Sequence, residues 1–192
     1  MYIVGEGSGE MGQGELELLQ ETLNGNLDAW GEIVRRYQDA TYGIALGVLK
    51  NSADAEEITQ DAFIRAYQKL DLYDMSKKFS TWLFTITSNL AKNRLRRERF
   101  TAPLKDTLQL FGGEDPADAA ERDERRSHVQ EALASLDEKY RMPLVLRFYG
   151  ELDYQEIADA LGVPEGTIKT RIHRGKQTLQ DRLTAKGVTD HA

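Results

Sequence analysis

The sequence of 192 residues contains no cysteine, and only three histidines and four prolines. The absence of cysteine excludes disulfide bonds and thiolate metal sites and agrees with a reducing compartment. A zinc site would need unusual partners for His128, His173 and His191. No apolar run approaches the roughly 20 residues that cross a bilayer, and the N-terminus lacks the features of a secretory signal. We therefore expect a cytoplasmic protein without membrane insertion, without a metal and without another cofactor.

Positive charge is absent from Met1 to Ile33, and the whole chain carries a formal net charge of −7. Taken alone, this acidic balance argues against a nucleic-acid-binding protein. The cations are concentrated, however, in two short stretches of the chain. These are Lys92, Arg94, Arg96, Arg97, Arg99 and Lys105 in the first, and Lys169, Arg171, Arg174 and Lys176 in the second. Two basic islands in an acidic chain indicate two contacts with phosphate, with acidic surfaces left for protein partners.

Apolar residues recur at spacings of three and four through most of the chain, which predicts an all-α fold. The glycine-rich residues 1–14 cannot form a core and are expected to be disordered. A helical domain is predicted over residues 15–99, a flexible linker with proline and glycine over 100–127, and a second helical domain over 128–186, followed by a tail over 187–192. The sequence thus predicts two helical domains joined by a linker.

Several helix boundaries can be proposed from local residues. The turn Asn24–Asn26 closes the first helix, and Asp28 is expected to cap the second. Ser52 or Asp54 is expected to start the third helix. A polar connection over residues 72–78 leads into another helix from about Phe79 to Arg99.

The segment Tyr154–Lys176 has the pattern of a helix-turn-helix. Gly162 can take the left-handed conformation that ends a first helix, and Ile168 and Ile172 lie one turn apart on the inner face of a second. The opposite face of that second helix carries Lys169, Thr170, His173 and Arg174. A helix with such a face suits the major groove of duplex DNA. The competing interpretation is a plain helical hairpin with a solvated basic face; a metal-binding role for His173 is not expected.

Two segments of the first domain also carry candidate binding residues. Asp54, Glu57 and Asp61 form one acidic ridge with Gln60 beside it, which could dock on a basic partner; taken alone, the ridge is better explained as a solvated helix face. Aromatic residues from Phe79 to Phe84 precede a helix rich in amides and cations, which is a composition suited to single-stranded nucleic acid. Core packing is the main role expected for Phe79 and Trp82. Asn89 and Asn93 are harder to explain by packing, because buried amides need partners.

Together these segments resemble the bacterial sigma factors, specifically their extracytoplasmic-function group. Residues 54–63 resemble the segment that binds the clamp helices of the largest polymerase subunit. Residues 79–84 and 89–93 resemble the part that melts and reads the minus-ten element, and residues 136–176 the domain that reads the minus-thirty-five element. The resemblance covers roughly residues 15–99 and 128–184. Two features depart from the housekeeping members of the family. Leu83 follows Trp82, so their paired tryptophans are absent. Only the linker lies between the two predicted domains, so their large third domain is not expected here.

The resemblance implies an alternative sigma factor that directs promoter recognition, melting and transcription initiation and has no catalytic residue. It implies contact with core RNA polymerase for Asp54, Glu57, Gln60 and Asp61. It implies binding of the single-stranded minus-ten element for Tyr73, Asp74, Lys77, Lys78, Trp82, Asn89, Lys92, Asn93, Arg96 and Arg97. It implies binding of the duplex minus-thirty-five element for Lys169, Thr170, Arg171, His173, Arg174 and Lys176. An anti-sigma factor is the further partner that the resemblance implies.

Three other functions compete with this interpretation. A helix-turn-helix repressor or response regulator would act on duplex DNA, often as a dimer, but would leave the acidic ridge and the 79–97 segment without a use. An RNA-binding module would leave the helix-turn-helix unexplained. An enzyme is the weakest alternative, because the sequence shows no phosphate loop, metal cluster or nucleophile–base pair. The preference for single-stranded or duplex nucleic acid distinguishes these functions.

Overall fold

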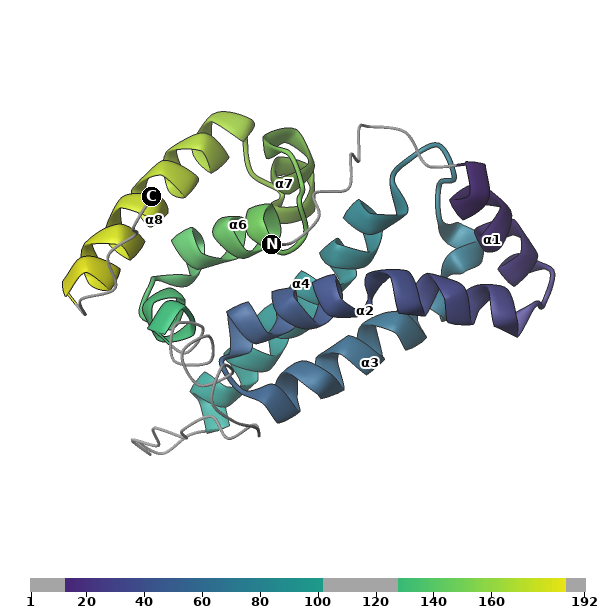
Figure 1. Ribbon diagram of the computed structural model, residues 1–192, viewed down its shortest axis with the longest axis horizontal. Helices are drawn as coiled ribbons and strands as arrows, with labels where there is room; N and C mark the ends of the chain where they lie inside the picture. The colour runs from purple at the N-terminus through teal and green to yellow at the C-terminus, as the bar shows by residue number, and fades with distance from the viewer. Residues whose placement is uncertain (1–12, 102–127, 186–192) are drawn as a thin grey trace, which may run out of the picture.

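The computed structural model describes residues 13–101 and 128–185, and within these two ranges the chain is helical with no β-strand (Figure 1). The expected all-α fold is confirmed. The expectations for residues 1–12, 102–127 and 186–192 lie outside the described residues. Gln13 and Gly14 are helical rather than part of a disordered N-terminus, and the helix expected to end near Arg99 continues to Thr101.

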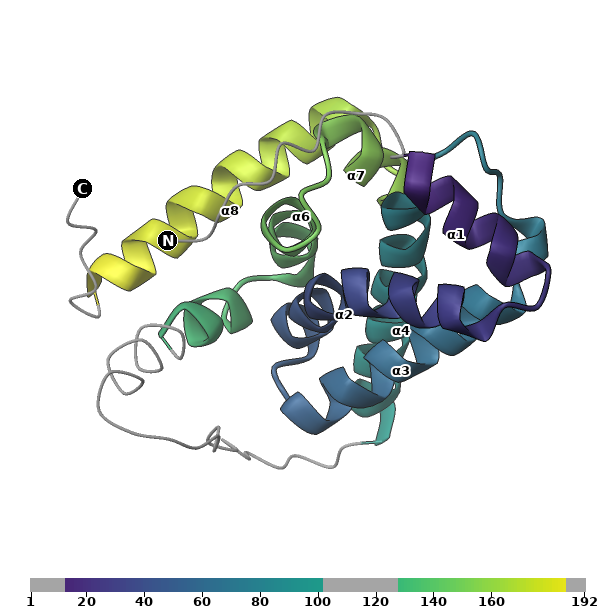
Figure 2. The same ribbon diagram turned by 45° about the vertical axis from the view of Figure 1, so that its right-hand side comes forward.

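The first helical domain consists of α1 (Gln13–Leu23), α2 (Leu27–Leu49), α3 (Ser52–Gln68), the 3-10 turn η1 (Leu70–Leu72) and α4 (Phe79–Thr101). α2 lies at its centre and packs against α1, α3 and α4 (Figure 2). Aromatic rings fill the space between these helices. Phe79 is fully buried, and its ring centroid lies 6.3 Å from that of Trp30 and 5.6 Å from that of Tyr37.

Two helices begin one residue after an asparagine that the sequence analysis did not identify as a cap. The Asn26 side chain accepts hydrogen bonds from the backbone N–H groups of Asp28 and Ala29 at 3.0 and 3.3 Å. The Asn51 side chain accepts one from Asp54 at 3.0 Å. The prediction that Asp28 caps α2 is wrong, because a cap residue must keep an extended backbone and Asp28 is already helical. Ser52 is the first residue of α3, as predicted.

The second domain contains helical residues 128–134, α6 (Glu138–Phe148), α7 (Tyr154–Leu161) and α8 (Glu165–Ala185). Asp153 and Glu156 form a reciprocal capping box at the start of α7, with hydrogen bonds of 2.8 Å in both directions. Gly162 ends α7 at φ 65°, the left-handed conformation predicted for it. Its backbone N–H bonds to the carbonyl of Ala158, so α8 starts at a sharp angle to α7.

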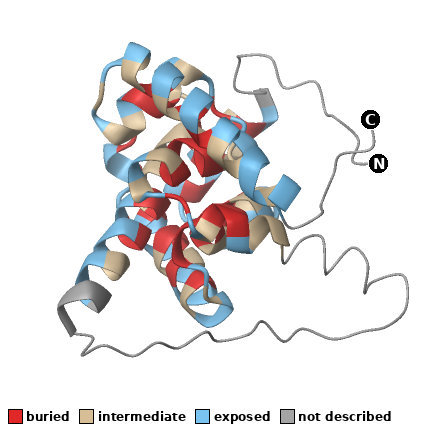
Figure 3. Cartoon of the chain, turned by 90° about the vertical axis from the view of Figure 1, so that its left-hand side faces the viewer, coloured by how far each residue is buried: buried red, intermediate tan, exposed pale blue. Residues whose placement is uncertain are grey.

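The two domains pack against each other, with α6 on α2 and α7 beside α4 (Figures 1 and 2). α2 has Gly43 and Gly47 one turn apart, and Val145 of α6 and Tyr149, which caps the end of α6, lie against them. A Cβ atom on Gly43 would lie 2.5 Å from Tyr149 Cδ1, and one on Gly47 would lie 2.8 Å from Val145 Cγ2. The glycines therefore permit a close approach of the two domains, and a continuous buried core runs through the contact (Figure 3).

Candidate nucleic-acid interface

The basic face of α8 is oriented by apolar residues on its other side. Ile168 and Ile172 are 0% and 2% exposed. At Gly175 the two helices α8 and α6 approach so closely that an added Cβ would lie 2.8 Å from Leu144 Cδ1. This packing turns outward the polar side chains of the opposite face, which are those of Lys169, Thr170, His173, Arg174 and Lys176. Arg171 is half-buried between the two faces.

Hydrogen bonds and ring contacts hold several of these side chains in place. The Lys169 amine lies 2.8 Å from a carboxylate oxygen of Glu165, and this hydrogen bond raises the pKa of Lys169. The Thr170 hydroxyl donates to the carbonyl of Gly166 at 2.9 Å. The Lys176 amine sits 5.3 Å from the ring centroid of Phe148. Such local contacts restrain long side chains before a ligand arrives.

A hollow of about 300 Å³ lies between the N-terminal parts of α6 and α8. Arg171 and Arg174 reach it from α8, and Lys139 and Tyr140 reach it from α6. The sequence analysis missed Lys139 and Tyr140, because they lie about 30 residues before the basic stretch that begins at Lys169. Their position at the start of a helix, two and three residues after the Asp137 cap, is the one signal that points to them.

Tyr73 anchors the loop between η1 and α4 from the inside, and its ring is not exposed on the loop surface. The Tyr73 side chain is 7% exposed, and its hydroxyl donates to the backbone carbonyl of Lys77 across the loop. Its ring lies 4.9 Å from that of Trp82 and 5.6 Å from that of Phe79. Burial and nearby acidic groups raise the pKa of Tyr73, so the hydroxyl stays protonated and can donate. Trp82 is half-buried behind the loop, in agreement with the packing role expected for it.

The exposed tip of this loop carries Asp74 and Lys77. Asp74 accepts two hydrogen bonds from Ser76, at 3.0 Å from the backbone and 2.7 Å from the hydroxyl, and these bonds lower its pKa. Lys77 is exposed to solvent. Lys78, the last residue of the loop, instead forms an ion pair of 2.9 Å with Glu156 of α7. The tip of the loop is therefore charged and held by hydrogen bonds within the loop, whereas the last loop residue contacts the second domain.

Polar side chains continue along the exposed side of α4. Asn89, Lys92, Asn93 and Arg96 are exposed and follow one another at spacings of three, one and three, so they share a face of the helix. Exposed amides with no packing role are free to bond to base edges, and the cations beside them can hold phosphates. Arg97 is exposed as well, and both Arg97 and Asn93 border the hollow between α4 and α3.

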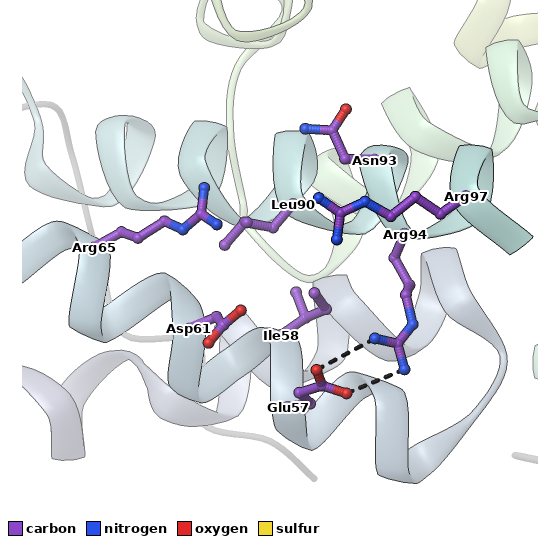
Figure 4. A pocket seen from close by; sticks show the side chains of 8 residues that line it. All are labelled: Glu57, Ile58, Asp61, Arg65, Leu90, Asn93, Arg94 and Arg97. Atoms are coloured by element: carbon purple, nitrogen blue, oxygen red, sulfur yellow. Dashed lines mark hydrogen bonds and ion pairs between the residues drawn. The ribbon is translucent and has the colours of Figure 1, made fainter.

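The acidic ridge of α3 is partly paired with α4. The guanidinium of Arg94 bonds to Asp54 and also to Glu57. Its distances to the two Glu57 oxygens are 3.1 and 3.2 Å (Figure 4). Burial lowers the pKa of Arg94, but these hydrogen bonds outweigh it, and the net shift is upward. Asp61 lines a hollow of about 110 Å³ beneath Arg94 and Arg97.

Gln60 is exposed on the same ridge and stands next to an exposed apolar residue that the sequence analysis missed. Ile64 lies one turn after Gln60 and is 54% exposed. Tyr67, three residues further, is 40% exposed. Because a lone isoleucine in an amphipathic pattern is normally assigned to the core, only the structure reveals that Ile64 extends the ridge as an apolar patch.

Comparison with protein families identifies the two domains separately. Residues 33–101 match the model of Sigma-70 region 2, and residues 127–179 match that of Sigma-70 region 4. The ECF RNA polymerase sigma factor SigW of Bacillus subtilis (strain 168) is 37% identical over 176 residues, which cover 86% of this chain and 94% of SigW. The chain belongs to the sigma-70 family. It is an alternative sigma factor of the extracytoplasmic-function group.

Other relatives and solved structures agree with this assignment. The ECF RNA polymerase sigma-E factor of Escherichia coli (strain K12) is 30% identical over 177 residues, covering 86% of this sigma factor and 92% of the relative. CnrH, solved in complex with the cytosolic domain of CnrY, superposes with a TM-score of 0.70 and 25% identity over 90% of this chain and 99% of that one. RpoE of Bartonella quintana, solved with the anti-sigma factor NepR, has the same fold, with a TM-score of 0.65 and 23% identity over 80% of this chain and 96% of RpoE.

Over residues 13–101 and 128–185, no three histidine or acidic side chains gather in a way that would hold a metal ion. None of the helices in those ranges combines the length and apolarity that a membrane span requires.

Proposed function

We propose that this sigma factor binds core RNA polymerase through α3, the unpaired minus-ten strand through the 73–78 loop and α4, and the minus-thirty-five duplex through α8. The two domains proposed for these roles span residues 15–99 and 128–186. The row of exposed amides and cations on α4 supports this assignment most directly. A repressor that reads only duplex DNA through α8 would have no use for that row.

The polymerase contact is proposed for the part of the acidic ridge that remains accessible. Asp54 and Glu57 are bonded to Arg94, and this pairing lowers the net negative charge of the ridge at their end. Their main proposed contribution to the polymerase contact is therefore the shape of the surface. Gln60 and Asp61 offer polar groups, and Ile64 offers apolar area beside them. An apolar centre with a charged rim is the usual composition of a specific protein interface, and the charges steer the encounter.

For the minus-ten contact, we propose that the 73–78 loop contacts the unpaired strand at one end and that the exposed face of α4 binds its bases and phosphates. Tyr73 supports the loop from inside, while Asp74, Lys77 and Lys78 provide its polar groups. Asn89 and Asn93 would bond to base edges of the unpaired strand. Phosphates would be held by Lys92, Arg96 and Arg97.

The minus-thirty-five contact is proposed to place α8 in the major groove. Lys169 and Thr170 lie on its outer face near the N-terminal end, which is the part of a recognition helix that reaches base edges, and Arg174 follows Thr170 one turn later on the same face. His173 and Lys176 extend this surface toward the phosphates. Arg171, with Lys139 and Tyr140, forms the hollow that would receive the DNA backbone.

Further proposals concern partners and compartment. CnrH and RpoE were each solved with a protein partner, which for RpoE is named an anti-sigma factor. We propose that an anti-sigma factor also binds this protein, that it acts in the cytoplasm, and that it performs no chemical step itself. In this view the polymerase supplies the catalysis, and the sigma factor supplies the position on DNA.

The polymerase contact is tested by a pull-down with core RNA polymerase and by run-off transcription, comparing the intact chain with Gln60→Ala/Asp61→Arg. The matched control is Gln180→Ala/Asp181→Arg, which changes the same pair of residue types on the exposed end of α8. We expect core binding and transcripts to be lost in the first variant and retained in the control. Tight duplex binding without any core binding by the intact chain would contradict the proposal and favour the repressor.

A further inference from the structure

A carboxylate of the second domain occupies a cationic site at the start of α4. The Glu156 Oε1 atom lies 2.9 Å from the Lys78 amine and accepts a hydrogen bond of 3.1 Å from the Thr81 hydroxyl. The other oxygen of Glu156 accepts from the backbone N–H of Asp153 in the capping box of α7. The Glu156 side chain is 15% exposed, so the carboxylate is largely removed from water and yet fully bonded.

The two groups that hold this oxygen are also suited to a phosphate. An ammonium and a hydroxyl within one helical turn, at 2.9 and 3.1 Å from a single anionic oxygen, have the composition and distances of a phosphate contact. The first turn of α4 contains no acidic residue of its own, so the positive end of this helix also favours an anion. Thr81 lies in the 79–84 segment that resembles part of the minus-ten reader, but it was not among the individual site residues predicted from the sequence.

The position of this site links it to the strand-binding surface. Lys78 ends the loop proposed to bind the minus-ten strand, and Thr81 lies in the first turn of the helix that carries Asn89 and Asn93. A backbone phosphate of a strand that follows the loop onto α4 would pass the start of the helix. That phosphate and Glu156 cannot bond to the same amine and hydroxyl at one time.

We propose that Lys78 and Thr81 form a binding site for a backbone phosphate of single-stranded DNA, and that Glu156 fills this site in the free protein. Binding of the strand and contact between the domains therefore exclude each other at this point. The inference rests on the proposed strand-binding role of the loop and α4. It adds a phosphate contact and a competitor built into the same chain.

Separation of the domains is required for promoter binding on independent grounds. A compact chain of this length has a radius of gyration of about 16 Å. Two promoter elements nearly two helical turns apart are separated by roughly 60–70 Å, at about 34–36 Å per turn. Some two dozen residues join Thr101 to His128, and their extended length of roughly 80 Å is sufficient, at about 3.3 Å per residue. Release of Glu156 from Lys78 and Thr81 is then part of engaging DNA.

The test is a fluorescence-anisotropy titration of the full chain with labelled, random-sequence single-stranded DNA of about 15 nucleotides. Glu156→Gln removes the negative charge but keeps the capping box, in which glutamine also serves. The control Asp159→Asn removes one charge from an exposed position on the same helix. We expect Glu156→Gln to bind DNA about threefold to fivefold more tightly than the control, because a larger fraction of the chain is open.

Two further measurements test the cationic half of the phosphate site and the separation of the two domains. Lys78→Met should reduce the slope of log affinity against log salt by about 0.7, the loss of one phosphate contact to a single strand. Since the chain has no native cysteine, spin labels can be placed on cysteines at the exposed positions Gln68 and Gln177. The distance between them should lengthen when DNA is added, and should be longer in Glu156→Gln before any DNA is present.

Each failure has a distinct meaning. Equal DNA affinity of Glu156→Gln and Asp159→Asn, or DNA binding with an unchanged label distance, would overturn the competition while leaving the sigma-factor surfaces untouched. An unchanged salt slope in Lys78→Met would overturn the phosphate site. Absence of DNA binding in all variants up to about 1 mM, well above the usual non-specific range, would overturn the strand-binding role of the loop as well.

Discussion

Arg94 joins α3 and α4 through a single guanidinium that bonds to Asp54 and Glu57. The Arg94 and Asp54 side chains are 31% and 19% exposed, so this is a partly buried pair rather than a fully solvated one. Loss of the guanidinium would leave a half-buried carboxylate without its partner. The acidic ridge therefore depends on a residue from the neighbouring helix for its stability.

Replacement of Arg94 by methionine should lower the free energy of unfolding by about 1–2 kcal/mol, because two charge-assisted hydrogen bonds are lost. Arg96→Met, at an exposed position two residues away, should change it by less than about 0.5 kcal/mol. Urea unfolding followed by circular dichroism measures both. Equal effects of the two substitutions would show that the Arg94 pairs contribute nothing to stability.

The buried Tyr73 and the partly buried Tyr37 predict a loss of stability at alkaline pH. Burial raises the pKa of Tyr37 and of Tyr73 above the usual 10.0, and Glu15 raises both further. Because the folded chain holds these protons more tightly than the unfolded chain, their stabilising contribution is complete below pH 10. It is lost as the pH rises from there toward the higher folded pKa values.

Thermal unfolding measured between pH 9 and 11 should show this decline, and Tyr37→Phe should make it less steep. Tyr67→Phe, at a ring that is 40% exposed, is the control and should leave the steepness unchanged. An identical decline in wild-type protein and Tyr37→Phe would exclude Tyr37 as its source.

At the scale of the helical element, the turn between α7 and α8 depends on backbone conformation alone. Gly162 has a φ of 65°, and no atom lies within 4 Å of the position that its Cβ would take. A substitution there is therefore penalised by the left-handed backbone rather than by a clash. Gly166, inside α8, also has open space around it but a helical backbone.

This pair provides a matched test of the helix-turn-helix. Gly162→Ala should destabilise the chain by about 1–2 kcal/mol, whereas Gly166→Ala should stabilise it by up to about 1 kcal/mol. Chemical unfolding monitored at the second domain distinguishes them. The account of the turn would be wrong if both substitutions shifted stability in the same direction.

Hydrophobic periodicity and the position of Gly162 were sufficient to predict the helix-turn-helix of the second domain. The Gly162 turn, the outer face of α8 and the buried Ile168 and Ile172 all follow from spacing. The cap of α2 was misplaced because Asn26 and Asp28 are equally good caps by residue type, and only the backbone decides between them. The inward position of Tyr73 was also missed, since a tyrosine in a polar loop gives no sign of the ring that receives it.

At the scale of the whole molecule, the contact between the domains was the feature least accessible from sequence. It depends on Gly43 and Gly47, which in a helical pattern appear only as weak helix formers. Their role emerges when Tyr149 and Val145, from a segment about 100 residues later, are placed against them. No local pattern encodes a pairing of this kind between elements so far apart in the chain.

Gly43→Ala/Gly47→Ala should separate the domains while leaving α2 intact, because each alanine favours the helix but collides with α6. Small-angle X-ray scattering should then show a larger radius of gyration than in the wild type. Gly31 lies on the same helix, and the nearest atom to an added Cβ there is the flexible end of the Arg35 side chain at 3.6 Å. Gly31→Ala should therefore not change the radius of gyration. An unchanged radius in the double variant would mean that these glycines do not set the contact.

The central claim is that one chain positions core RNA polymerase on DNA through two separate surfaces. It is tested most directly by transcribing genomic fragments of the source organism with core polymerase, with and without the chain, and mapping the transcript 5′ ends. We predict new start sites that share two upstream elements nearly two helical turns apart, and we predict that Arg174→Ala relaxes only the distal one, by about 1–3 kcal/mol of discrimination. Polymerase that binds the chain and yet produces no new shared start sites would contradict the account.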